Sequence, residues 1–117
     1  MKKHYSTPVA LYPATLHLSV CSAKAWLRYL HKFSDVEVES NDPDGECVML
    51  TGNTIEIFIR IRLWKPEPMW QALLVHECFH ALSYLTEHLG ITGGEAHAYL
   101  LQSLTETCFK ALDVKKK

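Results

Sequence analysis

The chain has 117 residues, and its 12 lysines and arginines nearly balance its 13 aspartates and glutamates, for a net charge of −1. This length fits a single domain, residues 1–117, with a modest core and at most a shallow active site. The even charge balance argues against nucleic acid as a partner, because no basic stripe is present to neutralise phosphates.

The first elements predicted along the chain are a strand and a helix. Leu16, Leu18 and Val20 alternate with polar residues, as in a half-buried strand. Ser22 is a suitable cap for a following helix. The apolar residues of that helix recur at helical spacing and are Ala23, Trp26, Leu27, Leu30 and Phe33.

A hairpin is predicted in the middle of the chain. Residues 36–39 are a weak strand candidate, and a polar loop over residues 41–45 separates them from a strand at residues 47–50. Gly52 and Asn53 are typical of a hairpin turn. The second arm has the clearest strand pattern, with Phe58 on its outer face. Its inner face consists of Ile55, Ile57, Ile59, Ile61 and Leu63.

Two helices are predicted in the last part of the chain. Pro66 and Pro68 mark the start of a long helix that ends at Gly90. Gly93 and Gly94 precede a final helix with its own apolar stripe. The order of strand, helix, two or three strands, helix and helix predicts an α+β fold. We expect a small antiparallel or mixed sheet that is packed on one side by three helices.

The long helix carries His76-Glu77-Cys78-Phe79-His80, an H-E-x-x-H motif. Two histidines four residues apart project from one helix face, so their imidazoles can bind a single Zn²⁺. Glu77 lies beside the first ligand, where it can take a proton from zinc-bound water and pass it to a leaving amine. The alternative interpretation is a pair of core histidines with satisfied hydrogen bonds.

A catalytic zinc ion needs a third protein ligand and an open fourth position. Glu95 is the favoured candidate, because it lies at the head of the final helix, which we expect to return alongside the motif helix. Its alternative role is to place a negative charge at a helix N-terminus. His97 is the competing ligand, and since it lies two residues further on, only one of the two side chains can face the site.

Two tyrosines are candidates for stabilising an oxyanion. Tyr99 lies one turn after Glu95 on the same helix face, and Tyr84 has the same relation to His80. Tyrosines at such spacing are more often core residues with a satisfied hydroxyl.

The cellular compartment is indicated by the cysteines and by the hydropathy pattern. The four cysteines stand far apart without a C-x-x-C pair, as is typical of buried thiols in a reducing compartment. No apolar run is long enough to span a membrane, and polar residues interrupt the N-terminal segment where a signal peptide would need its apolar core. We therefore expect a cytoplasmic protein without a membrane partner.

Residues 73–82, LLVHECFHAL, and residues 94–101, GEAHAYLL, resemble the short zincin-like proteins of tailed phages and prophages, and more broadly the gluzincin metallopeptidases. The resemblance implies that His76, His80 and Glu95 bind zinc and that Glu77 is the catalytic base. In zincins the edge strand above the motif helix binds the substrate backbone as an added strand. The resemblance would assign that role to residues 55–63.

The sequence thus predicts a zinc-dependent peptidase that hydrolyses peptide bonds with water activated between Zn²⁺ and Glu77. Its substrate would be a peptide or a protein. One alternative is a non-catalytic zinc-binding accessory or assembly protein of a phage. A second alternative is a metal-free interaction module whose amphipathic last helix packs on a partner or on a second copy.

Overall fold

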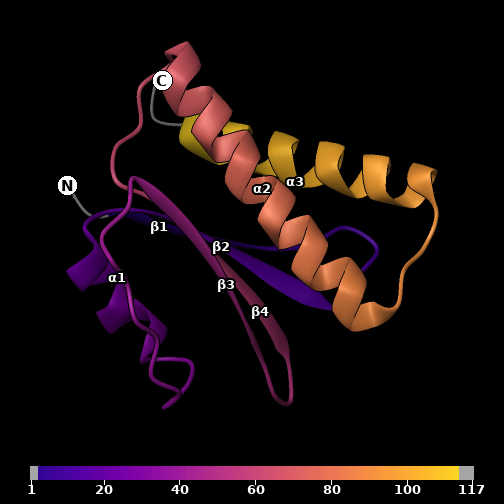
Figure 1. The fold of residues 1–117 in the computed structure, drawn as a ribbon, viewed down its shortest axis with the longest axis horizontal. Coiled ribbons are helices and arrows are strands. Elements are labelled where there is room, and N and C mark those ends of the chain that lie inside the picture. Colours follow the sequence, from indigo (N-terminus) through magenta and orange to yellow (C-terminus); the bar gives the residue numbers. More distant parts are fainter. Residues whose placement is uncertain (1–2, 114–117) are drawn as a thin grey trace.

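The structure is a computed structural model that describes residues 3–113. Its elements follow in the order β1 (Lys3–Pro8), β2 (Ala14–Val20), α1 (Ala23–Leu30), β3 (Gly45–Thr51), β4 (Ile55–Ile61), α2 (Pro68–Leu89) and α3 (Gly94–Asp113). The strands form one four-stranded sheet in the order β1-β2-β4-β3. This arrangement, drawn in Figure 1, confirms the α+β fold with a small sheet and three helices.

The sheet is mixed because one of its three pairings is parallel. β1 pairs with β2 and β3 pairs with β4 in antiparallel fashion, whereas β2 and β4 run parallel, from Ala14 opposite Ile55 to Val20 opposite Ile61. β3 and β4 form the predicted hairpin around Gly52, whose amide donates to the Thr54 carbonyl. β4 therefore lies inside the sheet, and β1 and β3 are its edges.

Two strand predictions were wrong. β1 was not predicted, because an edge strand with polar residues such as His4 and Ser6 lacks a clear hydrophobic alternation. Residues 36–39, the weak strand candidate, form no strand.

The Ser22 cap of α1 is present, since the Ser22 hydroxyl oxygen accepts a hydrogen bond from the Ala25 amide at 3.2 Å.

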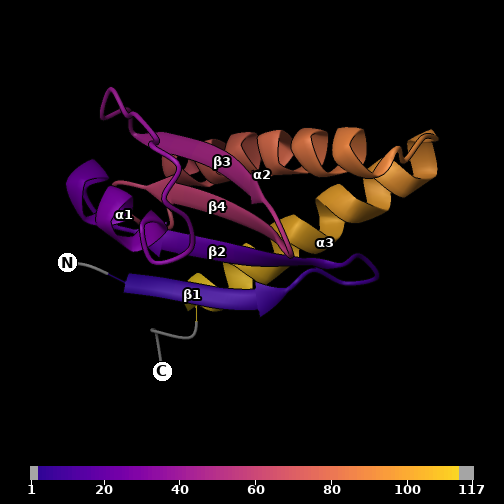
Figure 2. The ribbon, with the colours of Figure 1, turned by 90° about the horizontal axis from the view of Figure 1, so that it is seen from below.

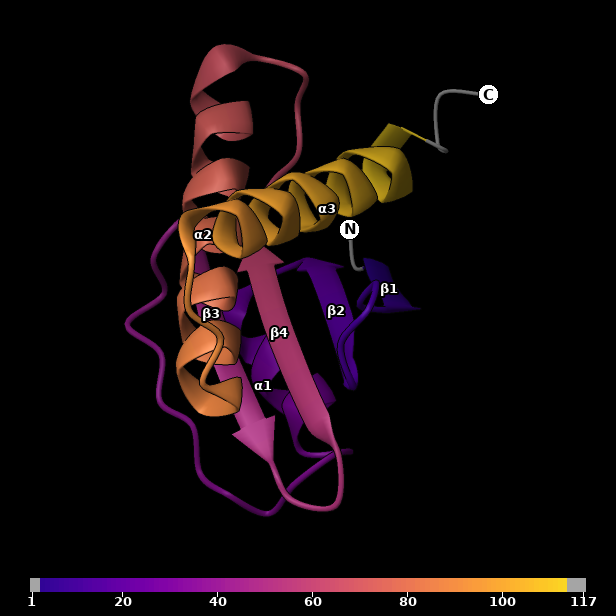
Figure 3. The ribbon, with the colours of Figure 1, turned by 90° about the vertical axis from the view of Figure 1, so that its right-hand side faces the viewer.

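The helices cover both faces of the sheet, which corrects the expectation that they lie on one side. α2 and α3 pack on the aliphatic face, where Ile57, Ile59 and Ile61 are fully buried. α1 packs on the opposite face, where Phe58 meets Trp26 in a second apolar cluster. Figures 2 and 3 show α1 and α3 on opposite sides of the sheet. Phe58, which broke the strand pattern in the sequence, is the residue on which α1 packs.

α2 begins and ends where its sequence signals predict. Pro68 occupies the first turn, where its missing amide costs nothing, and Gly90 ends the helix with a left-handed φ of 70°. Residues 3–113 contain no helix that is long and apolar enough to cross a membrane. α2 and α3 pack against each other through their buried faces, where the free thiols of Cys78 and Cys108 have their sulfur atoms 3.8 Å apart. His76 and His80 of the motif lie outside this buried face.

Candidate metal centre

His76 and His80 form a close pair on the solvent side of α2. Their Nε2 atoms lie 3.1 Å apart, and their rings meet edge to face with centroids 4.7 Å apart. Two nitrogens bound to a tetrahedral Zn²⁺ at about 2.0–2.1 Å would lie roughly 3.3 Å from each other. The spacing of the two nitrogens is therefore close to that of two ligands on one ion.

Tyr84 extends the histidine row by one more turn of α2. Its ring stacks on that of His80 with centroids 6.3 Å apart. Partial burial raises the pKa of the Tyr84 phenol, and nearby Cys47 and Glu77 raise it further. The phenol therefore keeps its proton and can act as a hydrogen-bond donor beside the histidines.

Glu77 lies between α2 and the sheet, and only 4% of its surface is exposed. Burial raises the pKa of its carboxyl group, while His76 and His80 act in the opposite direction. A raised pKa makes this carboxyl group a stronger proton acceptor than an ordinary glutamate. The position next to His76 brings this group to the edge of the imidazole pair.

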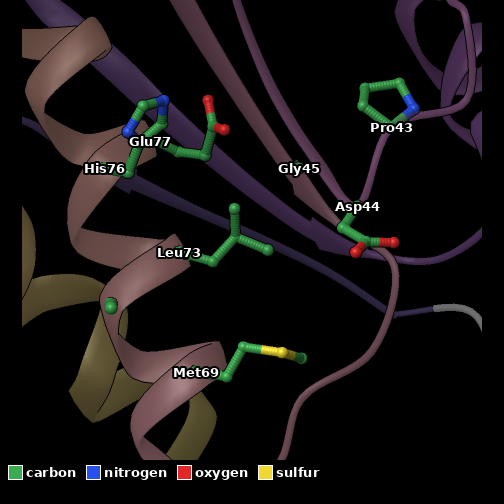
Figure 4. Close-up of a pocket in the computed structure, with 8 residues that line it drawn as sticks. Pro43, Asp44, Gly45, Met69, Leu73, His76 and Glu77 are labelled. Atoms are coloured by element: carbon green, nitrogen blue, oxygen red, sulfur yellow. The ribbon is translucent and has the colours of Figure 1, made fainter.

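The carboxylate of Glu77 points toward the first residue of β3. A Cβ atom added at Gly45 would lie only 3.0 Å from Glu77 Oε2 and 3.1 Å from Leu73 Cδ1. In Figure 4, Glu77 and Leu73 project from α2 toward the chain at Gly45. The missing side chain of Gly45 thus leaves the space in which the carboxylate sits.

An open cleft of about 460 Å³ lies between α2 and the chain that enters β3. Its walls are mostly apolar on the α2 side, and the motif residues stand at one end (Figure 4). The lining residues are Pro43, Asp44, Gly45, Met69, Ala72, Leu73, His76 and Glu77. The cleft is open to solvent, and the buried carboxylate of Glu77 is part of its lining.

The position of Gly45 depends on Arg60, which is fully buried on the α1 face of the sheet. Its guanidinium donates to the Glu46 carboxylate at 2.9 Å, to the Cys21 carbonyl at 3.0 Å and to the Pro43 carbonyl at 2.6 Å. These bonds tie the chain before β3 to β4. Arg60 belongs to no motif and was not predicted as a functional residue, although its cross-strand pairing with Glu46 follows from the Gly52 turn.

Cys47, two residues after Gly45, also faces α2. Burial raises the pKa of its thiol well above the ordinary value, and the negative charge of Glu77 raises it further. The thiol is therefore a neutral, poorly nucleophilic neighbour of the carboxylate.

The strand beside the motif helix is β3, and this corrects the assignment of residues 55–63 as the substrate-binding edge. Among the strands that residues 3–113 form, β4 has partners on both sides, whereas β3 pairs with β4 alone. β3 packs against α2, as Figures 2 and 3 show. The strongest alternation in the sequence belongs to the internal strand β4, because its isoleucines lie on the face covered by α2 and α3 while Glu56 and Arg60 on the other face are held in polar contacts.

The remaining residues predicted for the site lie on α3. Glu95 and Tyr99 are exposed, and the His97 ring bonds to the Ile91 carbonyl at 3.1 Å in the loop between the helices. Within residues 3–113, no three histidine, cysteine, aspartate or glutamate side chains are grouped so that they could hold a metal ion. The structure thus brings together His76, Glu77 and His80, with Tyr84 beside them, but not Glu95 or Tyr99.

No family model, no curated protein and no solved structure matches this chain.

Proposed function

We propose that the chain is a zinc-dependent peptidase in which His76 and His80 hold the metal and Glu77 is the catalytic base. The observation that carries this proposal is the 3.1 Å separation of the two Nε2 atoms next to a buried carboxylate. A structural pair of histidines would need neither a buried glutamate at its side nor an open cleft leading to it. The resemblance of residues 73–101 to zincin-like metallopeptidases supports the same assignment.

Each residue would have a distinct task. Zinc, when bound, would act as a Lewis acid that polarises a peptide carbonyl and makes a nearby water more acidic. Glu77 would receive the proton of that water at its carboxylate and return it to the departing amine. The Tyr84 phenol would donate to the oxygen on which negative charge develops.

We assign the third ligand to Glu95 rather than to His97. The His97 ring is already bonded to the Ile91 carbonyl. The exposed Glu95 carboxylate has no hydrogen-bond or ion-pair partner among residues 3–113, so its binding to the ion would break no existing contact. Because Glu95 is not grouped with His76 and His80 within residues 3–113, its binding to the ion would require the first turn of α3 to shift toward α2.

The proposed substrate is an extended peptide. β3 is an edge strand beside α2, and its free side can pair with a peptide backbone next to the cleft. Assignment to the cytoplasm is part of this proposal and rests on the wide spacing of the cysteines in the sequence.

The test is cleavage of an unstructured protein such as casein by the untagged, zinc-loaded chain. Glu77→Gln should lower the rate by about 10²-fold or more, the range for loss of a general base. Glu87→Gln, an exposed glutamate on the same helix, is the matched control and should retain full activity. Stoichiometric zinc without any cleavage would instead assign the chain to the non-catalytic zinc-binding class.

A further inference from the structure

A second group of chemically active side chains lies on the α1 face of the sheet, on the other side from the cleft. Ser6 on β1 and His17 on β2 are direct partners in the strand register. Glu56 on β4 and Tyr29 on α1 complete the group. None of these residues belongs to the H-E-x-x-H motif or touches it.

The side chains of Ser6, His17 and Glu56 form a chain of hydrogen bonds. The Ser6 hydroxyl lies 2.8 Å from His17 Nδ1, and His17 Nε2 lies 2.6 Å from Glu56 Oε1. Because a carboxylate only accepts hydrogen bonds, Nε2 carries the imidazole proton and Nδ1 is left as the acceptor. Nδ1 can accept one hydrogen bond, and of the two hydroxyls within reach that of Ser6 at 2.8 Å is closer than that of Tyr29 at 3.1 Å. With Ser6 as the donor, its hydroxyl faces a base that a carboxylate orients, which is the arrangement of an activated serine nucleophile.

The imidazole is rigidly held, whereas the hydroxyl is accessible. His17 is 3% exposed and stacks on Phe58 with ring centroids 4.5 Å apart and planes 10° from parallel. Phe33 contacts the same ring at 4.7 Å. Ser6, in contrast, is exposed on the edge strand. A purely structural hydrogen bond does not require its hydroxyl to face solvent.

Tyr29 adds a donor and borders a basic cavity. Its hydroxyl lies 3.2 Å from the Ser6 hydroxyl and 3.1 Å from His17 Nδ1. An adjacent cavity of about 290 Å³ is lined by His4, Ala25, Arg28, Tyr29 and Lys32. The cationic side chains of Arg28 and Lys32 at this cavity favour an anionic group on the molecule that binds there.

We propose that Ser6, His17 and Glu56 form a metal-independent ester hydrolase site for small carboxylic esters that carry an anionic group. The Ser6 oxygen attacks the ester carbonyl carbon while its proton passes to His17 Nδ1. The bond to the leaving alcohol breaks, and that alcohol takes the proton from His17. Water then attacks the carbonyl carbon of the acyl-Ser6 ester and gives its proton to His17 Nδ1. The bond between Ser6 Oγ and the acyl group breaks, and His17 returns the proton to Ser6. One ester and one water thus give one acid and one alcohol.

In this reaction Ser6 and His17 are catalytic residues, and Glu56 is a positioning residue. The Tyr29 hydroxyl would donate to the carbonyl oxygen as it becomes negatively charged. Glu56 acts only through His17, by fixing the tautomer and the orientation of the ring.

The test uses the full-length untagged chain in EDTA with two probes, 4-nitrophenyl acetate and mono-4-nitrophenyl succinate. Release of 4-nitrophenol should fall at least about 100-fold in Ser6→Ala, and Ser103→Ala on α3 is the control that should not change. Peptide mapping after an acid quench should find the acyl group on Ser6. Glu56→Gln should lower kcat without a matching change in KM.

Two results would overturn the inference. An unchanged rate in Ser6→Ala would show that the hydrogen-bond network is structural only. Arg28→Gln should raise KM more for the succinate ester than for the acetate ester. An equal change in KM for the two esters would refute the anionic substrate class. The use of EDTA and a His76→Ala background separates this site from the proposed zinc peptidase, since neither should affect hydrolysis at Ser6.

Discussion

Substitution of Gly45 by alanine tests whether the carboxylate of Glu77 occupies the space that this glycine leaves. The new methyl group would meet Glu77 Oε2 at 3.0 Å, Leu73 Cδ1 at 3.1 Å and Glu77 Cγ at 3.2 Å. Since ordinary contacts lie near 3.5–4.0 Å, all three are too close. Overpacking of this kind costs about 1–3 kcal/mol.

The expected net loss for Gly45→Ala is smaller than the overpacking cost. A glycine-to-alanine change without backbone strain stabilises a protein by about 0.4–1 kcal/mol through the unfolded state, and Gly45 has no left-handed φ. A net destabilisation of about 0–2.6 kcal/mol remains, with its middle near 1.3 kcal/mol. Gly52→Ala is the matched control, because its Cβ meets nothing within 4 Å, and it should be neutral or slightly stabilising.

Urea unfolding of four proteins measures the effect. The wild type, Gly45→Ala, Glu77→Ala and the double variant form a cycle whose coupling energy isolates the contact between the two positions. Removal of the Glu77 side chain deletes two of the three close contacts. The cost of Gly45→Ala should then fall by about 1 kcal/mol. An equal cost in both backgrounds would refute the placement of the carboxylate against Gly45.

Three further predictions follow from buried charged and polar groups. Arg60→Ala should cost about 3–5 kcal/mol in urea unfolding, because it leaves Glu46 without its buried partner; a cost below about 1 kcal/mol would contradict the anchoring role. In metal-free protein, Glu77→Gln should gain stability relative to the wild type as the pH rises above about 4.3, because the raised pKa of Glu77 makes ionisation costly in the folded state. A difference in stability between Glu77→Gln and the wild type that does not grow with pH would contradict the raised pKa of Glu77. Above about pH 8.5 the wild type should lose stability, because the Cys47 thiol ionises more readily in the unfolded chain than in the folded one, where its pKa is raised. Cys47→Ala should reduce this loss. Equal pH profiles of stability for the two proteins would contradict the burial of Cys47 beside Glu77.

The fold could be predicted from the sequence wherever one element alone carries the signal. The isoleucine alternation of β4, the Ser22 cap and the Pro68 and Gly90 boundaries of α2 are local features, and the structure confirms them. The parallel pairing of β2 with β4 has no local signature, because it depends on how the chain crosses the sheet. The position of α1 on the second face was indicated only by Phe58.

The candidate site divides in the same way. His76, Glu77 and His80 adjoin one another through the helical repeat, so the sequence places them together. Gly45 and Arg60 belong to other elements and reach the site only through the β3–β4 hairpin. Glu95 was expected near the histidines from a simple antiparallel return of α3. The buried stripe of α3 instead orients the helix by packing Leu100 and Leu104 in the core, which leaves Glu95 exposed.

The metal content of the untagged protein tests the central claim most directly. After zinc is supplied and excess is removed, elemental analysis should find one zinc ion per chain in the wild type and in His88→Ala, an exposed histidine of the same helix. His76→Ala and His80→Ala should each lose it, because one remaining imidazole cannot hold the ion. A wild-type chain that binds no zinc would contradict the metal centre and leave the two histidines as a hydrogen-bonded pair on α2.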